Sequence, residues 1–546
     1  MKQSMKWWQT TTIYQIYPRS FLDTNNDGIG DLKGIISKLN YIKNLGFETI
    51  WISPFYKSPG KDFHYDISDY TQIDPIFGTI DDVDVLIKEI HNRKMRIVFD
   101  MVLNHTSNEH PWFQESRSSI DNPKRDWYLW KKGNEKGKPP NNWMSMINKP
   151  GWNYDAQTDE WYFANFLDFQ PDLNYRNPEV KKAMFAIMRF WLDKGVDGFR
   201  LDIFNSIFKD SEFRDNPFSL RFIPTPDSQD EAFFQKKIHT LNHPDCFGLA
   251  KEIHSLLNEY QNDRFLLGEV SGNDTTLKKF LGEKNDGLHL VFQFELIHFQ
   301  FSAKFFRDLL SKNEAIYPYP FTPTYVYGNH DQMRYIEKVD RNPAKAKLLA
   351  LFQFTARGIP VVYYGEEIGM QDTDIPNWAG KDPIAQQNAF FPKFLANAIG
   401  VYMNRDNCRT PMQWNSTETA GFTSATTKPW IAVSKCYSEF NVETESLDEN
   451  SLLNTYKRLL KLRNENPAFQ MGSLEIIADY NKYPNLLVFR RFTQDKSFEV
   501  FLNFGSESLE ITISDIKKCI FSLTGAVIKL DSKLELAAYS GIVLEI

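Results

Sequence analysis

Short hydrophobic runs alternate with segments of helical periodicity along the first 470 residues. The runs have the length of buried strands, whereas apolar residues recur every three or four positions in helical stretches at 32–45, 81–93 and 452–464. The strand-like runs lie at 13–17, 49–53, 96–100, 198–202, 265–269, 290–294, 325–329 and 360–364. About eight strands separated by helices predict parallel β/α repetition that closes into a barrel.

Two regions depart from this alternation. Residues 105–173 are rich in Trp, Asn, Pro and Gly and lack helical periodicity, which predicts a subdomain inserted after the third strand. Beyond residue 470, short alternating segments predict an antiparallel sheet. We therefore expect an α/β fold in three domains. These are a (β/α)8 TIM barrel (domain A, 1–104 and 174–470), an inserted domain B (105–173) and a C-terminal β-sandwich (domain C, 471–546).

Composition narrows the possible partners. A chain of 546 residues is too long for one compact core, and its net charge of −7 without a basic block argues against nucleic acid. No apolar run approaches the ~20 residues of a membrane helix, and the first residues lack the pattern of a secretory signal. The expectation is a cytoplasmic enzyme, monomeric or homodimeric, that acts on a small molecule and not at a membrane.

Polar residues gather where the predicted strands end. Asp100 is followed by Asn104 and His105, and later strands end at Asp202, at Glu269 and at 329–331. Barrel enzymes collect their catalytic residues at the carboxyl ends of strands, so these side chains are expected in one site. Taken alone, each acid could equally be a helix cap. Taken together, the acids favour a catalytic site.

Four segments together resemble glycoside hydrolase family 13, the α-amylase family. They are Asp-Met-Val-Leu-Asn-His at 100–105, Gly-Phe-Arg-Leu-Asp at 198–202, Leu-Gly-Glu at 267–269 and Tyr-Gly-Asn-His-Asp at 327–331. The segments 170–174 and 405–414 are similar to the oligosaccharide-cleaving α-glucosidase branch, and the insert at 117–143 looks like bacterial α-glucosidases that act on short α-glucosides.

The resemblance implies three catalytic carboxylates. Asp202 is implied as the nucleophile that forms a covalent β-glucosyl intermediate, and Glu269 as the acid that protonates the leaving oxygen and later activates water. Asp331 is implied to hold sugar hydroxyls more tightly as the transition state develops. Arg200 lies two residues before Asp202 on the same strand face, where it would keep the nucleophile ionised, with Asp100 as its supporting partner.

The resemblance also implies a set of substrate-binding residues. His105 and His330 would hydrogen-bond the non-reducing glucose, and Asp62 would grip its terminal hydroxyls with Arg405 as partner. Tyr65 and Phe166 would supply stacking surfaces; ordinary core packing is the alternative for these two rings.

A polar loop precedes the first predicted helix. Oxygen-bearing side chains at Asp23, Asn25, Asp27 and Asp31, with the Ile29 carbonyl, could surround a hard cation. The related branch holds Ca²⁺ or Mg²⁺ here, away from the catalytic centre, so a structural ion is expected and no organic cofactor. A polar turn without an ion is the alternative.

Linkage specificity depends on the position after the nucleophile. In this branch Val accompanies α-1,6 cleavage there, and Ala or Thr accompanies α-1,4 preference; Ile203 is closer to Val in shape and polarity. Ile147 stands where close relatives carry Phe, on the aglycone side. The segment 213–245 is long and punctuated by proline, and it would cover the far side of the pocket.

Three functions are compatible with these residues. The first is a retaining exo-α-glucosidase acting on maltose-, sucrose- or isomaltose-type substrates, with an oligo-1,6-glucosidase or dextran glucosidase as its close variant. The second is a sucrose isomerase or glucosyltransferase, which shares the covalent step and passes glucose to a sugar instead of water. A transporter-associated, non-catalytic relative would need a membrane helix and would lack these carboxylates, so we set it aside.

Overall fold

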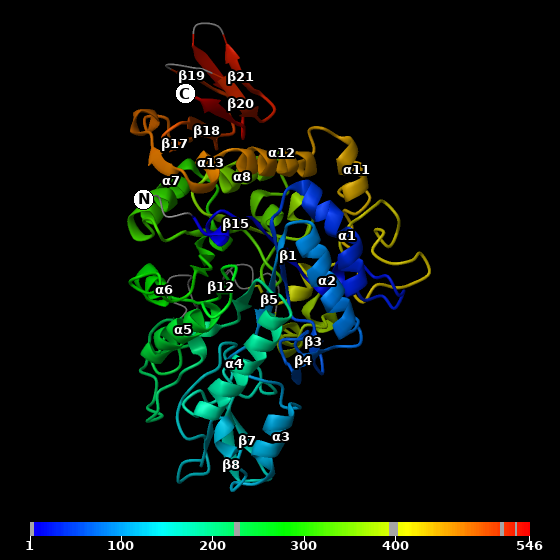
Figure 1. The fold of residues 1–546 in the computed structure, drawn as a ribbon, viewed down its shortest axis with the longest axis vertical. Helices are drawn as coiled ribbons and strands as arrows, with labels where there is room; N and C mark the ends of the chain where they lie inside the picture. Colours follow the sequence, from blue (N-terminus) through cyan, green and yellow to red (C-terminus); the bar gives the residue numbers. More distant parts are fainter. Residues whose placement is uncertain (1–4, 223–229, 392–401, 514–517, 530–531) are drawn as a thin grey trace.

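The computed structural model describes residues 5–222, 230–391, 402–513, 518–529 and 532–546. Its parts follow one another along the long axis of the molecule (Figure 1). The barrel lies in the middle. The insert, with α3, β7 and β8, lies at one end, and the sheets of the C-terminal region lie at the other.

Eight parallel strands form the central sheet, in the order β13-β12-β9-β5-β2-β1-β15-β14. The strands are β1 (Ile13–Ile16), β2 (Thr49–Ile52), β5 (Arg96–Met101), β9 (Gly198–Leu201), β12 (Phe265–Gly268), β13 (Leu290–Val291), β14 (Thr324–Val326) and β15 (Ile359–Tyr363). Every strand predicted from the sequence is present, which confirms the barrel class. The sixth is shorter than predicted because the chain turns into a 3-10 helix at Phe294–His298.

The two edge strands of this sheet meet through a side chain. The Thr324 hydroxyl on β14 donates a hydrogen bond to the Val291 carbonyl on β13 (2.8 Å) and accepts one from the Gln293 amide (3.1 Å). Alternate residues of the strands, including Ile13, Trp51 and Val98, fill the interior as one apolar cluster. The Thr324 hydroxyl thus joins β14 to β13 and closes the barrel.

Helices follow the strands and cover the outside of the barrel (Figure 1). They are α1 (Leu32–Leu45), α2 (Ile80–Asn92), α4 (Pro178–Asp193), α5 (Pro244–Leu257), α6 (Asp274–Leu281), α7 (Ala303–Ile316), α8 (Pro343–Thr355) and α12 (Leu452–Glu465). Helix α1 has the predicted bounds. The Asp31 side chain caps its first turn by accepting from the Gly34 amide (2.7 Å), and Gly46, at φ 109°, ends it.

The insert contains a short helix and a small antiparallel sheet. Helix α3 (Pro111–Ser118) precedes the sheet, whose order is β6 (Trp130–Lys131), β8 (Glu160–Phe163) and β7 (Trp152–Asp155). Trp143, Trp152 and Phe163 form its own apolar cluster. The buried Lys209, from the loop after β9, pairs with Asp172 of the insert and thereby fixes it to the barrel.

Two antiparallel sheets make up the C-terminal region. One has the order β16 (Ser473–Ile476), β17 (Leu486–Phe492), β18 (Ser497–Asn503), β23 (Gly541–Glu545) and β20 (Lys518–Ser522). The other has the order β19 (Leu509–Thr512), β22 (Lys533–Leu536) and β21 (Ala526–Lys529). A shared apolar cluster, including Val488, Phe501 and Leu534, lies between them, consistent with the predicted sandwich. The residue boundaries of the three domains stay a prediction.

Across the described residues, no helix combines the length and apolar character needed to cross a bilayer.

Candidate active site

A cavity of about 250 Å³ opens at the carboxyl ends of the barrel strands. This is just below the ~300–1,000 Å³ typical of small-molecule pockets. Its lining consists of Asp62, Tyr65, His105, Phe166, Gln170, Asp202, Ile203, Glu269, Asp331, Gln332, Ile384, Tyr402 and Arg405. The predicted catalytic and substrate-binding residues are therefore brought together. Arg200 and His330 do not line the cavity but contact residues that do.

Arg200 joins three carboxylates beneath the cavity. Its side chain is 1% exposed; Nη1 donates to Asp100 Oδ1 (2.9 Å) and to Asp202 Oδ1 (2.7 Å), while Nη2 donates to Glu269 Oε2 (2.6 Å). Arg200 lies on β9, and Asp100 lies opposite it on β5. The two acids implied in catalysis thus contact adjacent nitrogen atoms of one guanidinium.

Asp202 and Glu269 are electrostatically coupled. Burial raises the pKa of Asp202; Arg200 opposes this, while the charges of Glu269 and Asp100 and a hydrogen bond to Glu269 raise it further. A neighbouring carboxylate makes ionisation of Asp202 less favourable. Glu269 Oε2 accepts hydrogen bonds from Arg200 and from the Ile203 amide (3.1 Å).

A hydrogen-bonded chain supports this centre from the opposite wall. Gln15 Nε2 lies 2.8 Å from His330 Nδ1, and His330 Nε2 lies 2.7 Å from the Tyr65 hydroxyl. The Tyr65 hydroxyl in turn donates to Asp100 Oδ2 (3.0 Å), and its ring stacks on His330. With Gln15 as donor to Nδ1, the ring proton lies on Nε2. Burial lowers the pKa of His330 to about 3, so the ring is neutral at pH 7.

Asp331 is held by two arginines. Arg409 Nη2 (2.7 Å) and Arg405 Nη1 (3.2 Å) both donate to its Oδ1, and His330 Nε2 lies 3.1 Å from Oδ2. Burial raises the pKa of Asp331, but the surrounding donors outweigh it and bring the pKa below its usual value. Because His330 is neutral, we attribute this effect to the arginines. Asp331 is therefore ionised at neutral pH.

One end of the cavity is closed by a buried ion-pair cluster. Asp62, 1% exposed, accepts from Arg405 Nη2 (2.7 Å) and from Gln170 Nε2 (3.0 Å). Asp382 holds the other side of Arg405 by accepting from its Nε (3.0 Å), its Nη2 (2.7 Å) and its backbone amide (2.9 Å). Burial raises the pKa of Asp62, and Arg405 counteracts the rise.

Both ring nitrogens of His105 are engaged by the protein. Nε2 lies 3.2 Å from the Tyr65 carbonyl and Nδ1 lies 3.2 Å from Asn104 Nδ2. Asn104 Oδ1 in turn accepts from Lys209 Nζ (2.9 Å). Burial lowers the pKa of His105 to about 3. The ring can therefore contact a sugar through its surface. If Nε2 moves away from the Tyr65 carbonyl, its proton can instead be donated to a sugar hydroxyl.

Ile203 adopts a backbone conformation that a β-branched residue rarely takes. Its φ is 30° and its ψ is 45°, in the left-handed region. This turn directs its amide to Glu269 and its side chain to the cavity lining. Such strain persists where surrounding contacts impose it, which is common at functional sites.

The loop at 23–31 is ordered by its own side chains. Asp23 Oδ1 accepts from the Asn26 amide (2.7 Å), Asp23 Oδ2 accepts from the Gly28 amide (2.8 Å), and Asp27 Oδ1 accepts from the Ile29 amide (2.8 Å). No cluster of three or more His, Cys, Asp and Glu side chains within the described part of the chain is arranged for a metal ion. The oxygen donors predicted from the sequence are adjacent here but face backbone amides.

Sequence reasoning missed several residues of the site. Asp382 and Arg409 fix the arginine–aspartate cluster, Gln15 orients His330, and Ile384 and Tyr402 line the cavity. Asp382 caps the short helix α9 (Pro383–Gln387) and Ile384 lies within it; a helix of this length has no apolar periodicity, so no pattern marked either residue. Arg409 lies inside the recognised 405–414 segment, and its charge there was the signal that could have identified it.

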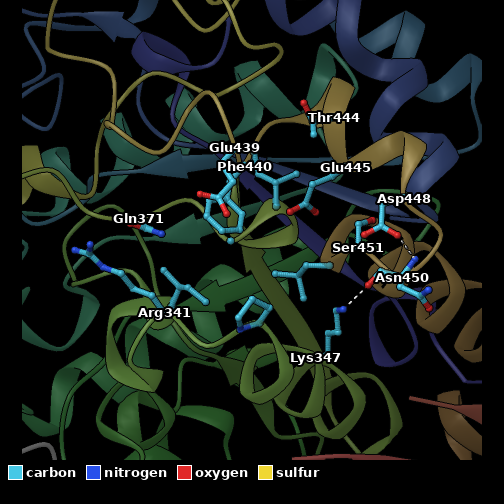
Figure 2. A pocket seen from close by; sticks show the side chains of 15 residues that line it. Arg341, Lys347, Gln371, Glu439, Phe440, Thr444, Glu445, Asp448, Asn450 and Ser451 are labelled. Carbon is cyan, nitrogen blue, oxygen red and sulfur yellow. Dashed lines mark hydrogen bonds between the residues drawn. The ribbon is translucent and has the colours of Figure 1, made fainter. Parts of the chain in front are cut away.

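A second cavity, of about 210 Å³, lies apart from these residues, around α8, α11 (Val442–Leu447) and α12 (Figure 2). Its polar groups serve the local fold. Glu445 Oε2 accepts from the Leu453 amide in the first turn of α12 (2.9 Å), and Lys347 donates to the Asn450 carbonyl. None of the predicted site residues line it.

The chain is similar in sequence to known proteins over most of its length. The family model described as "Alpha amylase, catalytic domain" matches residues 15–472. The chain is 40% identical to a probable α-glucosidase of Rhizobium meliloti over 86% of this chain and 85% of the relative. It is 37% identical to the oligo-1,6-glucosidase of Bacillus cereus over 95% of this chain and 92% of the relative.

Solved structures extend the similarity to the whole fold. An α-glucosyl transfer enzyme, XgtA, superposes with a TM-score of 0.89 at 35% identity, covering 99% of this chain and all of that one. The trehalulose synthase MutB of Pseudomonas mesoacidophila superposes with a TM-score of 0.88 at 31% identity, covering both chains fully. With its barrel, its acids and these relatives, the chain belongs to the α-amylase family of glycoside hydrolases.

Proposed function

We propose that the protein is a retaining exo-α-glucosidase that releases glucose from the non-reducing end of short α-glucosides. The observation that carries this proposal is the contact of Asp202 and Glu269 with the same buried guanidinium of Arg200. Retaining enzymes hold their two carboxyl groups ~5–5.5 Å apart, whereas inverting enzymes leave ~6.5–9.5 Å for a water. A single guanidinium that contacts both acids favours the shorter separation.

In the first step, an Asp202 carboxylate oxygen attacks the anomeric carbon as the glycosidic bond breaks. Glu269 Oε1 gives its proton to the departing oxygen, so the products are a β-glucosyl ester and a free aglycone alcohol. When Glu269 acts as the protonated acid, its charge no longer repels that of Asp202, and Arg200 keeps the nucleophile ionised. In the second step, Glu269 takes a proton from water, which attacks the ester and releases α-glucose.

Asp331 supplies the third charge. Its arginine partners keep it ionised, so a negative oxygen remains beside the sugar when positive charge develops at the anomeric centre. A fixed carboxylate of this kind stabilises the transition state more than the neutral substrate.

The ion pairs among Asp62, Arg405 and Asp382 at one end of the cavity support the proposed exo action. Asp62, Arg405 and Asp382 are all buried, so this end is blind and accepts a terminal sugar unit. Asp62 and Arg405 offer an acceptor and donors to the last hydroxyls of that unit. A longer glucan would have to extend from the opposite, open side.

Glucosyl transfer is the second candidate function, and the apolar residues of the cavity lining favour it. Ile203, Phe166 and Ile384 give the cavity an apolar part of its lining, which can hold a sugar ring in place of water. The neighbours named as an α-glucosyl transfer enzyme and a trehalulose synthase have the same fold. Transfer would use the same ester, with a sugar hydroxyl as the attacking group.

We also propose a structural Ca²⁺ or Mg²⁺ in the loop at 23–31. Every proposed ligand atom is an oxygen, which suits a hard cation. The oxygens come from the side chains of Asp23, Asn25, Asp27 and Asp31 and from the Ile29 carbonyl. Asp31 also caps α1, so the ion would stabilise the junction between this loop and that helix.

The anomeric outcome tests the proposed reaction. Proton NMR during hydrolysis of maltose, isomaltose and sucrose should show α-glucose first. Asp202→Asn should lower kcat by ~10⁴-fold or more on all three without changing the circular dichroism spectrum, because the nucleophile is lost. Glu269→Gln should retain activity on α-glucosyl fluoride, whose leaving group needs no proton. β-Glucose as first product, or an active Asp202→Asn enzyme, would contradict the mechanism.

Asp382→Asn tests the blind end. The amide cannot accept all the bonds that Arg405 donates, so Arg405 should lose its fixed position against Asp62. We expect kcat/KM for disaccharides to fall ~10–100-fold, mainly through KM, as for loss of a charged hydrogen bond. Asp308→Asn, an exposed partner of Lys304, is the matched control. An unchanged KM would show that Asp382 is dispensable.

Ile203→Thr tests linkage choice. The smaller, polar side chain should shift the ratio of α-1,6 to α-1,4 cleavage toward α-1,4 by ~10-fold, the effect of one group in an apolar pocket. Ile384→Thr makes the same change at another apolar lining residue, which does not adjoin the nucleophile in sequence, and should move the ratio less. Product analysis on paired maltose and isomaltose checks both. An unchanged ratio in Ile203→Thr would refute this role.

Metal removal tests the cation. Chelation should lower Tm by ~2–4 °C, because an ion at 100 times its Kd stabilises by ~2.7 kcal/mol. Added Ca²⁺ should restore Tm, while kcat below the transition stays constant. Asp27→Asn should have the lower Tm with or without chelator. A Tm that is indifferent to chelator and Ca²⁺ would eliminate the site.

A further inference from the structure

Lys209 is a buried lysine that contacts the insert and a neighbour of the active site at once. Its side chain is 2% exposed and comes from the loop after β9. Nζ pairs with the Asp172 carboxylate of the insert and donates to Asn104 Oδ1 (2.9 Å). Asn104 follows β5 and precedes His105, whose ring lines the active-site cavity. One ammonium therefore lies two contacts away from a predicted sugar-binding histidine.

This ammonium fixes which way the Asn104 amide faces. Lys209 Nζ and the Ser206 hydroxyl both lie 2.9 Å from Asn104 Oδ1. A hydroxyl can donate or accept, and Ser206 Oγ also lies 2.9 Å from the Ile203 carbonyl, to which it can give its one proton. An ammonium can only donate, so Lys209 can bond only to the oxygen of the amide. Lys209 thus holds Oδ1 and leaves Nδ2 facing His105, 3.2 Å from its Nδ1.

The orientation of this amide determines where the proton of His105 lies. Asn104 Nδ2 is a donor, so His105 Nδ1 is the acceptor. Burial lowers the pKa of His105 to about 3, so the neutral ring carries one proton, which is then on Nε2. Nε2 lies 3.2 Å from the Tyr65 carbonyl, which can only accept. Both neighbours of the ring therefore favour the same tautomer.

Nε2 is the ring nitrogen next to the cavity lining. Its partner Tyr65 belongs to that lining, whereas Asn104, the partner of Nδ1, does not. A proton on Nε2 offers a sugar hydroxyl a donor, and the other tautomer would offer a lone pair in its place. The direction of a hydrogen bond to the substrate thus depends on a lysine that does not line the cavity.

We propose that Lys209 is a positioning residue that acts through Asn104 to hold the His105 proton on Nε2, so that His105 donates a hydrogen bond to the bound glucose unit. The inference rests on the proposed α-glucosidase function. Asp172, the partner of Lys209, is itself fixed, because its Oδ1 accepts from the Asn165 amide (2.9 Å). The insert therefore helps to set the tautomer of an active-site histidine.

¹⁵N NMR of protein labelled at histidine tests the tautomer directly. The His105 signals, assigned by their loss in His105→Ala, should show a protonated Nε2 and an unprotonated Nδ1 in the wild type. In Lys209→Met the amide is free to turn, and Asp172, without its cation, attracts Nδ2. Nδ1 should then become protonated. Lys209→Arg, whose guanidinium also cannot accept, should keep the wild-type pattern.

Two results of this experiment would overturn the proposal. One is a wild-type His105 protonated on Nδ1, a result that does not depend on the folding of any variant. The other is a folded Lys209→Met protein that keeps the wild-type pattern.

Tyr128→Phe is the matched control. It removes the buried hydrogen bond between the Tyr128 hydroxyl and the hydroxyl of Thr106, the residue after His105 (2.8 Å). The bond from Lys209 to Asn104 is left in place. We expect the wild-type His105 pattern. A loss of the Nε2 proton equal to that in Lys209→Met would show that any loosening of this loop moves the proton, and would exclude a specific role for Lys209.

Kinetics test whether Lys209 acts through His105. Lys209→Met should lower kcat/KM for the preferred disaccharide about 10-fold, mainly through KM, as for loss of one hydrogen bond, and Lys209→Arg should recover most of it. In a His105→Ala background, the same substitution should have an effect below about 2-fold, because the group that it positions is already absent. Equal falls in both backgrounds would show that Lys209 acts by another route and would overturn the proposal.

The NMR experiment also separates this inference from the proposed function. A wild-type enzyme inactive on every α-glucoside would contradict the function. The NMR spectra require no substrate, so they would still show which nitrogen of His105 carries the proton and whether Lys209 holds it there.

Discussion

The contact of one buried guanidinium with three carboxylates organises the centre of this enzyme. Arg200 lies on β9, Asp100 opposite it on β5, and Glu269 directly after β12. The charges therefore connect three adjacent strands at the end where the cavity opens. Three carboxylates around one guanidinium leave an excess of negative charge. Together with burial, this excess raises the pKa of Asp202.

A second cluster complements the first with loop residues. Arg405 and Arg409 hold Asp331, and Arg405 also joins Asp62 to Asp382. Here the cations match the acids more nearly, so the pKa of Asp331 is lowered while that of Asp202 is raised. Asp202 and Glu269 thus follow barrel strands directly, whereas Asp62, Arg405 and Asp382 come from segments outside the strands.

Sequence patterns were most informative where a local rule acts. The bounds of α1 follow from its apolar spacing, its Asp31 cap and Gly46, and all eight barrel strands were visible as apolar runs. The acids were found because they follow those runs and match family motifs. Asp382 was missed because its partner Arg405 lies across a loop, and pairing of this kind depends on tertiary structure. The left-handed conformation of Ile203, whose amide donates to Glu269, likewise accompanies a contact distant in sequence.

Between β13 and β14 the barrel is joined through the Thr324 hydroxyl and not by a ladder of backbone hydrogen bonds. Strand separation would begin between these two strands, because the fewest hydrogen bonds must break there. Asp100 and Arg200 lie on β5 and β9, which are inner strands of the sheet, so a transient opening between β13 and β14 would leave their ion pair intact. The barrel can thus open at one pair of strands without separating Arg200 from Asp100.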